Sequence, residues 1–141
     1  MDEFPFTGAE WGAVNDAVLP LVNATLAEDD VLHASAQEEL RCVLNQLRVR
    51  YGDHPVLLET EADFCDDDAE RVALYRRAIE VAVAHGLPTL SIRLSLAQLL
   101  VDDNDRSAAR DELHACAPEL READASDNQA WESLMAEVNV L

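Results

Sequence analysis

The sequence predicts an all-α protein of about seven helices. Apolar residues recur at intervals of three and four along most of the chain, which is the period of an amphipathic helix. No segment alternates between apolar and polar residues for long enough to predict a strand. Apolar residues make up 49% of the 141 residues and aromatic residues only 5%, so Leu, Val and Ala are expected to fill a core of closely packed helices in one domain.

A first helix is expected to begin after Thr7, because Thr7 and Glu10 have the spacing of a capping box. Pro20 lies inside this helix and is expected to kink or break it. The predicted apolar stripe consists of Trp11, Val14, Val18, Val22 and Leu26.

A second helix is expected from about Val31 to Tyr51, with Gly52 as its C-terminal stop. Arg48 and Arg50 lie near that end, where the helix dipole favours cations. The predicted buried face consists of Leu32, Ala36, Leu40, Val43, Leu44, Leu47 and Tyr51.

Further helices follow at short intervals, and short connections are typical of antiparallel neighbours. Pro55 opens a short helix from Val56 to about Cys65, and Asp68 is the expected N-cap of the next. That fourth helix runs to about Ala84, with Val72, Tyr75, Ala78, Ile79 and Ala82 facing inward. The last three predicted helices span about Pro88–Val101, Arg106–Leu120 and a segment beginning near Asn128 that carries Trp131, Leu134, Met135 and Val138.

The best-defined unit is a helical hairpin between Pro88 and Pro118. Its contact positions are Leu96, Ala97, Leu100, Ala109, Leu113 and Cys116, where small residues allow close approach. This pattern resembles a tetratricopeptide repeat. A weaker copy lies 35 residues earlier, where Ala62, Cys65, Asp68 and Ala78 match Ala97, Leu100, Asp103 and Leu113, although Glu61 stands where Leu96 predicts an apolar residue.

The resemblance implies an α-solenoid of stacked antiparallel hairpins. In that organisation residues 1–53 form an N-terminal helical hairpin, residues 54–121 form two tetratricopeptide-like hairpins, and residues 122–141 form a capping helix within a single domain, 1–141. Members of this family mostly bind peptides or other proteins on a concave face. Trp131, Val138, Val140 and Leu141 form an apolar end that could pair with a second copy.

The chain is strongly acidic, with 29 acidic and 10 basic residues, all of them Arg, for a net charge of −19. Such a surface repels nucleic acids and anionic lipids, so neither is an expected partner, and it attracts basic proteins. The same composition also fits a GC-rich genome or a salt-loving host. The opening "MDEFPFTG" has no signal-peptide pattern, so a cytoplasmic location is expected. Cys42, Cys65 and Cys116 are widely spaced and are expected to be reduced.

No metal, cofactor or catalytic set is predicted. "DDND" (102–105) has Ala108 where an EF-hand loop needs Gly, so Asp105 is expected to cap the sixth helix instead. "CDDD" (65–68) occupies the equivalent earlier turn. His114 and Cys116 lie about 200° apart around a helix and cannot converge on zinc. His54 and His85 flank helix breaks and are expected to be exposed.

The first helices of the two hairpins are expected to line a groove. Between their packing positions this face shows Glu59, Asp63, Asp66, Ser91, Ser95, Gln98 and Asp102. An acidic groove suits an Arg- or Lys-bearing peptide, although these residues could equally be solvated helix faces.

The sequence therefore predicts a non-enzymatic module that binds a basic protein segment. The alternative is an acidic escort or neutralising protein for a basic effector, toxin or nucleic-acid-binding domain.

Overall fold

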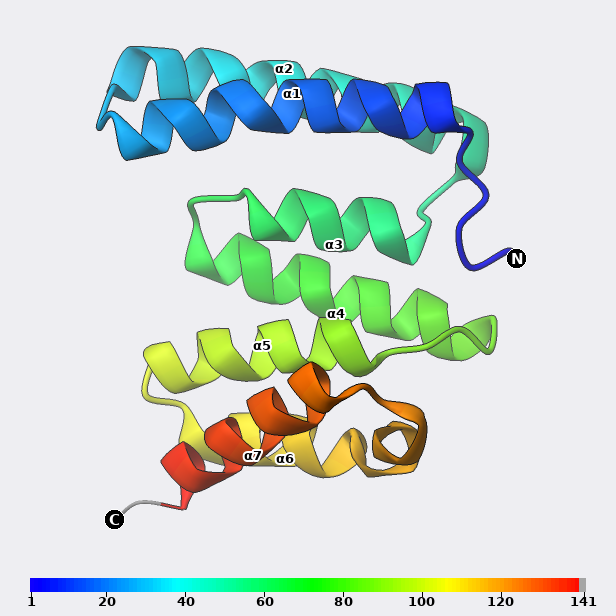
Figure 1. Ribbon diagram of the computed structural model, residues 1–141, viewed down its shortest axis with the longest axis vertical. Helices are drawn as coiled ribbons and strands as arrows, with labels where there is room; N and C mark the ends of the chain where they lie inside the picture. Colours follow the sequence, from blue (N-terminus) through cyan, green and yellow to red (C-terminus); the bar gives the residue numbers. More distant parts are fainter. Residues whose placement is uncertain (140–141) are drawn as a thin grey trace.

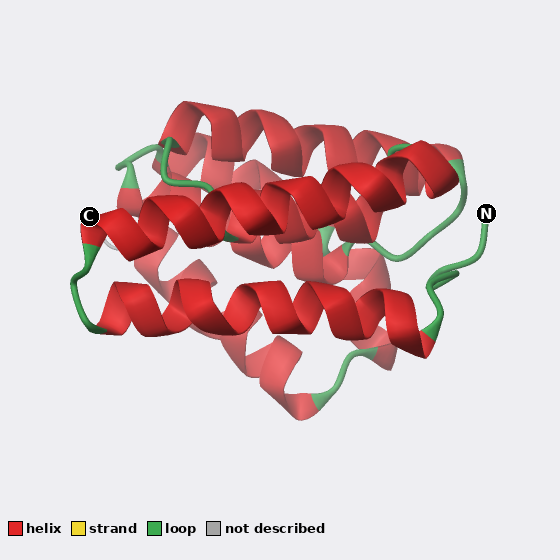
Figure 2. Cartoon of the chain, turned by 90° about the horizontal axis from the view of Figure 1, so that it is seen from above, coloured by secondary structure: helices red, strands yellow, loops and turns green. Residues whose placement is uncertain are grey.

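The computed structural model describes residues 1–139 and is all-helical over that range, as predicted. No strand occurs within it, and short loops join the helices (Figure 2). The elements are α1 (Gly8–Leu26), α2 (Asp30–Tyr51), α3 (Pro55–Asp63), α4 (Asp68–Ala84), α5 (Leu90–Asp102), α6 (Arg106–Ala115), the 3-10 helix η1 (Ala117–Glu122) and α7 (Ala125–Val138).

The helices pack as sequential pairs that succeed one another along the long axis of the molecule. Pairs α1 with α2, α3 with α4, and α5 with α6 make the most extensive contacts, and α4 also packs against α5 (Figure 1). Helix α7 closes the far end of the stack against both α5 and α6.

Helix ends follow local capping chemistry. The capping box at the start of α1 is confirmed, since Thr7 accepts from the Glu10 amide at 3.1 Å and Glu10 accepts from the Thr7 amide at 2.9 Å. Gly52 ends α2 with a φ of 73°, a left-handed conformation that favours glycine. The N-terminus of α5 lacks a cap of its own, and Glu119 from η1 accepts from the Thr89 and Leu90 amides instead.

Of the predicted kink or break at Pro20, the break does not occur, because α1 continues through Pro20 as one α-helix. The predicted apolar stripe is wrong in its second half. Val22 and Leu26 are 39% and 79% exposed, and the buried positions are Val14, Ala17, Leu21 and Ala24. Steps of four residues drift about 40° around a helix each time, whereas alternating steps of three and four stay on one face.

The buried face of α2 is largely the predicted one, with Ala36, Leu40, Leu44 and Leu47 in the core. Leu32 is an exception at 58% exposed, because it lies in the first turn of α2, near the exposed tip of the first hairpin.

The core has two parts that meet at α3. The first part joins α1 and α2 and includes Leu57, while the second extends from Leu58 through α4, α5 and α6 to α7. Leu57 and Leu58 are both at most 1% exposed. Adjacent residues project about 100° apart on a helix, so α3 places one leucine in each part of the core.

The predicted contact positions of the hairpin between Pro88 and Pro118 are all buried. The register of the earlier copy is wrong in its second helix, however. Asp67, not Asp68, is the N-cap of α4, and it corresponds to Asp105 at the start of α6, 38 residues later. The difference of three residues arises because α5 spans 13 residues and α3 only 9, while the turn after α5 is one residue shorter than the turn after α3.

The boundary between the last two helices also differs from the prediction. Helix α6 ends at Ala115 rather than near Leu120, and residues 117–122 form η1. Pro118 has no amide hydrogen to donate, which prevents continuation of the α-helical ladder. Helix α7 begins at Ala125 rather than near Asn128, since Asp124 caps it by accepting from the Asp127 amide at 2.8 Å.

Helix α7 is docked through its apolar side. Trp131 donates from Nε1 to the Leu113 carbonyl at 2.7 Å, and Val138 is 1% exposed. Arg110 donates to the Val138 carbonyl at 2.8 Å. Trp131 and Val138 therefore contact the core of their own chain, and the other residues of the suggested dimer contact, Val140 and Leu141, lie outside the described residues.

The two-part core leads to a stability prediction. Leu57→Ala and Leu58→Ala should each cost about 2–5 kcal/mol, as truncation of a fully buried leucine does. Trp11 packs against the first part and Trp131 against the second, so single-tryptophan backgrounds, W131F and W11F, report each part separately by fluorescence during urea unfolding. We expect Leu58→Ala to lower the urea midpoints reported by both tryptophans. Leu57→Ala should lower the midpoint reported by Trp11 more than the midpoint reported by Trp131, because Leu57 lies in the first part of the core.

Val49→Ala is the matched control, because Val49 is 90% exposed on α2 and should change stability by less than about 0.5 kcal/mol. An unchanged Trp11 midpoint in Leu57→Ala would contradict the role assigned to α3.

Candidate functional site

An open groove of about 590 Å³ lies between α5 and α7 and reaches the end of α3 and the start of α4. Buried leucines form its apolar base, since Leu94, Leu99 and Leu134 are 8%, 4% and 5% exposed. The remaining lining residues are Asp63, Arg71, Tyr75, Ser91, Ser95, Gln98, Asp102, Asp127 and Ala130.

Most of the predicted groove residues come together here. Asp63 from α3 and Ser91, Ser95, Gln98 and Asp102 from α5 all line the groove. The four side chains from α5 share one face of the helix, because they recur at intervals of three and four residues.

Two predicted residues lie elsewhere. Glu59 does not line the groove directly, but it accepts a hydrogen bond from the Ser91 hydroxyl at 3.1 Å. Asp66 lies in the turn after α3 and pairs with His33 at 3.1 Å, beside a second cavity. The turn carries Asp66 away from the face that a continued α3 would present, since α3 ends at Asp63.

Sequence reasoning missed the contribution of α7 and α4. Asp127, Ala130 and Leu134 all come from α7, and none of them was among the predicted groove residues. The capping spacing from Asp124 to Asp127 was the available signal for an earlier start of α7. Arg71 and Tyr75 reach the groove from the second helix of a hairpin, which the pattern of first helices did not indicate.

The groove is acidic on its walls. Asp63, Asp102 and Asp127 contribute carboxylates, and Arg71 is the one basic residue among the described residues that line it. Arg71 is already engaged, because its Nε donates to the Ala62 carbonyl at 3.1 Å and its guanidinium lies 3.8 Å from Asp68. The groove therefore keeps an excess of negative charge.

Two carboxyls have raised pKa values, that of Asp63 in the groove and that of Glu59 beside it. Burial raises the pKa of Glu59, and the neighbouring Asp63 charge raises it further. Desolvation by the groove walls also raises the pKa of Asp63, against the hydrogen bond that Tyr75 donates to it and the charge of Arg71. Burial and Asp63 in turn raise the pKa of Tyr75 to about 12.

The two acidic turns serve as helix caps. Asp67 accepts from the Glu70 amide at 2.9 Å and Asp105 from the Ala108 amide at 3.2 Å, so the predicted capping role of Asp105 is confirmed.

Within residues 1–139, no three His, Cys, Asp or Glu side chains are grouped so that they could hold a metal ion.

The expectation that His54 is exposed is wrong, since it is 1% exposed. Its Nδ1 accepts from the Val56 amide at 3.1 Å, which caps α3, and its Nε2 donates to the Asp2 carbonyl at 2.8 Å. His54 therefore acts as the N-cap of α3, and its place directly before Pro55 was the signal in the sequence for this role. His85 is exposed, as predicted, and Cys116 is buried.

Comparison of the chain with protein-family models, curated proteins and solved structures finds no match. The helices of residues 1–139 include none with the length and apolarity needed to cross a membrane.

The raised pKa of Glu59 leads to a pH-dependent prediction. A carboxyl whose pKa is higher in the folded state stabilises the fold when protonated, and this contribution is lost as the pH rises through that pKa. Glu59→Gln should therefore unfold with a larger free energy than the wild type at neutral pH. The difference should shrink as the pH falls toward and below 4.5, the ordinary Glu value.

Chemical denaturation across this pH range measures the effect, and Glu38→Gln on the exposed face of α2 is the control, with a much smaller change expected. A Glu59→Gln variant that is less stable than the wild type at neutral pH would contradict the prediction, because it would mean that the ionised Glu59 carboxylate stabilises the fold.

Proposed function

We propose that this chain is a tetratricopeptide-like α-solenoid that binds a basic segment of another protein in the groove between α5 and α7. The succession of antiparallel pairs supports the repeat assignment, as do the small residues at the helix contacts. Ala62, Ala78, Ala97 and Ala109 are all 0% exposed, which allows close approach of neighbouring helices. The proposed activity is binding without catalysis.

The observation that carries this proposal is the combination of an apolar base with acidic walls in one groove. Leu94, Leu99 and Leu134 can contact the aliphatic part of a bound segment, while Asp102 and Asp127 face its cationic groups. Arg and Lys side chains have both an apolar stem and a charged end, so they match both parts of the surface.

The groove carboxylates retain hydrogen-bonding capacity. Asp102 accepts a hydrogen bond from the side-chain Nε2 of Gln98 at 3.0 Å, and an ionised carboxylate can accept about four hydrogen bonds. A guanidinium group can therefore form paired hydrogen bonds there, which are stronger than bonds between neutral groups. The net charge of −19 adds long-range attraction that speeds association with a basic partner.

An escort or neutralising role is the second candidate, and it is favoured by acids outside the groove. Glu38 and Glu39 on α2, Glu80 on α4 and Glu132 on α7 are all exposed. A folded basic protein could contact such a wide surface, and it would then bind tightly while its isolated segments bind weakly.

The main test is a titration of the protein with two synthetic peptides of equal length, one rich in Arg and Lys and one rich in Asp and Glu. The basic peptide should bind, and increasing salt should weaken that binding. Asp102→Asn with Asp127→Asn should weaken it about tenfold, since each partly exposed carboxylate contributes roughly 0.7 kcal/mol.

Glu38→Gln with Glu39→Gln is the matched control, because it removes the same charge from α2, away from the groove. Equal loss of affinity in the control pair would contradict a localised site, and equal binding of the acidic peptide would contradict the proposed partner. Tight binding of a folded basic protein without peptide affinity would favour the escort role.

A further inference from the structure

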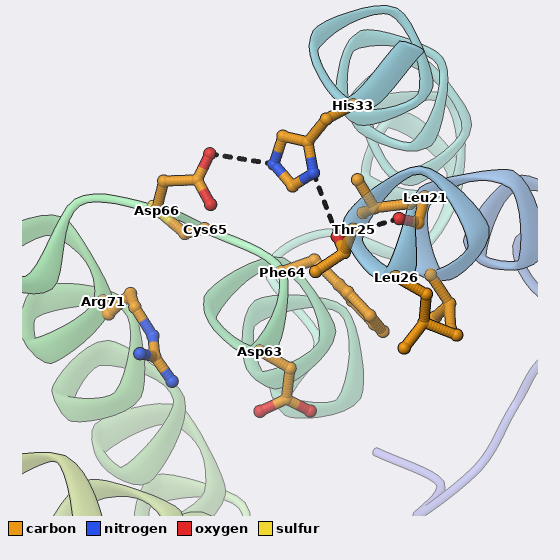
Figure 3. A pocket seen from close by; sticks show the side chains of 10 residues that line it. Leu21, Thr25, Leu26, His33, Asp63, Phe64, Cys65, Asp66 and Arg71 are labelled. Atoms are coloured by element: carbon orange, nitrogen blue, oxygen red, sulfur yellow. Dashed lines mark hydrogen bonds and ion pairs between the residues drawn. The ribbon is translucent and has the colours of Figure 1, made fainter. Parts of the chain in front are cut away.

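A second cavity adjoins the groove, beneath the tip of the first hairpin. It has a volume of about 370 Å³ and lies between the end of α1, the start of α2 and the turn after α3 (Figure 3). Leu21, Val22, Leu26 and Phe64 form its apolar walls. Its remaining lining residues are Thr25, His33, Asp63, Cys65, Asp66 and Arg71.

At the edge of this cavity, Thr25, His33 and Asp66 are linked by hydrogen bonds. His33 lies between Thr25 and Asp66, with Nδ1 at 3.0 Å from the Thr25 hydroxyl and Nε2 at 3.1 Å from Asp66 (Figure 3). The Thr25 hydroxyl also donates to the Leu21 carbonyl at 2.9 Å. The imidazole and the hydroxyl are thus already paired, so the four apolar side chains of the lining are the surface on which an apolar occupant can pack.

The apolar walls are in contact with water when the cavity is empty. Leu26 is 79% exposed in the last turn of α1, and Val22 is 39% exposed one turn earlier. Covering these side chains removes apolar surface from water, which is favourable in proportion to the area covered.

The cavity and the acidic groove are continuous, because Asp63 and Arg71 line both. The apolar walls lie on α1 and the turn after α3, whereas Asp102 and Asp127 lie on α5 and α7, so one or two helix spacings of roughly 10 Å each separate the two sites. An extended peptide advances about 3.3 Å per residue, so about three to six residues of one segment bridge this distance.

We infer that this cavity receives one bulky apolar side chain of the bound segment, about three to six residues from its cationic residues. The inference rests on the proposed function, since it deepens the description of the same partner. The segment then has two parts: an apolar anchor such as Leu or Phe between α1 and the turn after α3, and Arg or Lys residues beside Asp102 and Asp127.

The test uses pairs of peptides with the same Arg and Lys residues. One peptide of each pair carries Phe at a position three, four, five or six residues from them, in a set that covers the spacing of about three to six residues, and the other carries Ser at the same position. The Phe peptide should bind about tenfold more tightly, since a large apolar side chain is taken out of water. Equal affinity of the two peptides would overturn the inference while leaving the proposed function intact, whereas failure of both to bind would contradict the proposed function itself.

Variants locate the anchor. Val22→Ala with Leu26→Ala should reduce the preference for Phe to about twofold, because the apolar wall is truncated. Leu19→Ala with Val83→Ala is the matched control, since both residues are 61% exposed and neither lines the cavity. Loss of the preference in the control, or its persistence in the wall variant, would place the anchor elsewhere.

A chemical readout on the unmodified chain is independent of these substitutions. Cys65 lines the cavity, whereas Cys42 is exposed on α2. The Phe peptide should slow alkylation of Cys65 by a maleimide, measured by mass spectrometry of peptide fragments, while Cys42 reacts at its usual rate. Unchanged alkylation of Cys65 at a saturating Phe peptide concentration would overturn the inference.

Discussion

The structure depends on the burial of α3 on two sides. This helix has only nine residues, and an isolated helix of that length is not stable in water. Leu57 holds it against the first hairpin, while Leu58 and Ala62 hold it against α4 and the larger part of the core. Two polar links reinforce the first contact: Gln37 donates to the Phe64 carbonyl at 2.9 Å, and Arg48 pairs with Glu61 at 2.9 Å. Both the groove and the adjoining cavity begin where α3 ends, so their geometry depends on its position.

The distribution of charge follows from how few basic residues the chain has. Several arginines are committed to structural contacts, such as Arg93 with Glu112 at 2.8 Å and Arg110 with the Val138 carbonyl. Ten arginines cannot neutralise 29 acids, so the chain keeps a surplus of negative charge. In the groove part of this surplus lies above an apolar base. Burial raises the pKa of both Glu59 and Asp63 there.

Local signals in the sequence predicted local structure well. The Thr7 capping box, the Gly52 stop and the buried positions Leu96, Ala97 and Leu113 depend on a few neighbouring residues, and the structure confirms them. Pro20 does not break α1, and the neighbouring residues Ala17 and Leu21, before and after it, are both buried in the core that maintains the helix.

The candidate site was predicted mainly where it follows one helix, with Asp63 on α3 as the one predicted lining residue from elsewhere. Ser91, Ser95, Gln98 and Asp102 share a face of α5, which periodicity shows. The contribution of Asp127 and Leu134 depends on how α7 packs across α5, a tertiary contact with no local signature. The position of Asp66 likewise depends on a turn and on His33, 33 residues away in the chain.

The most direct test of the central claim is to map a bound basic peptide on the protein by NMR of the ¹⁵N-labelled chain. The account predicts saturable shifts of the amide resonances of Ser95, Gln98 and Asp102 on α5 and of Asp127 on α7. Shifts confined to the outer face of α2 around Glu38, or no saturable shifts in the groove, would contradict it.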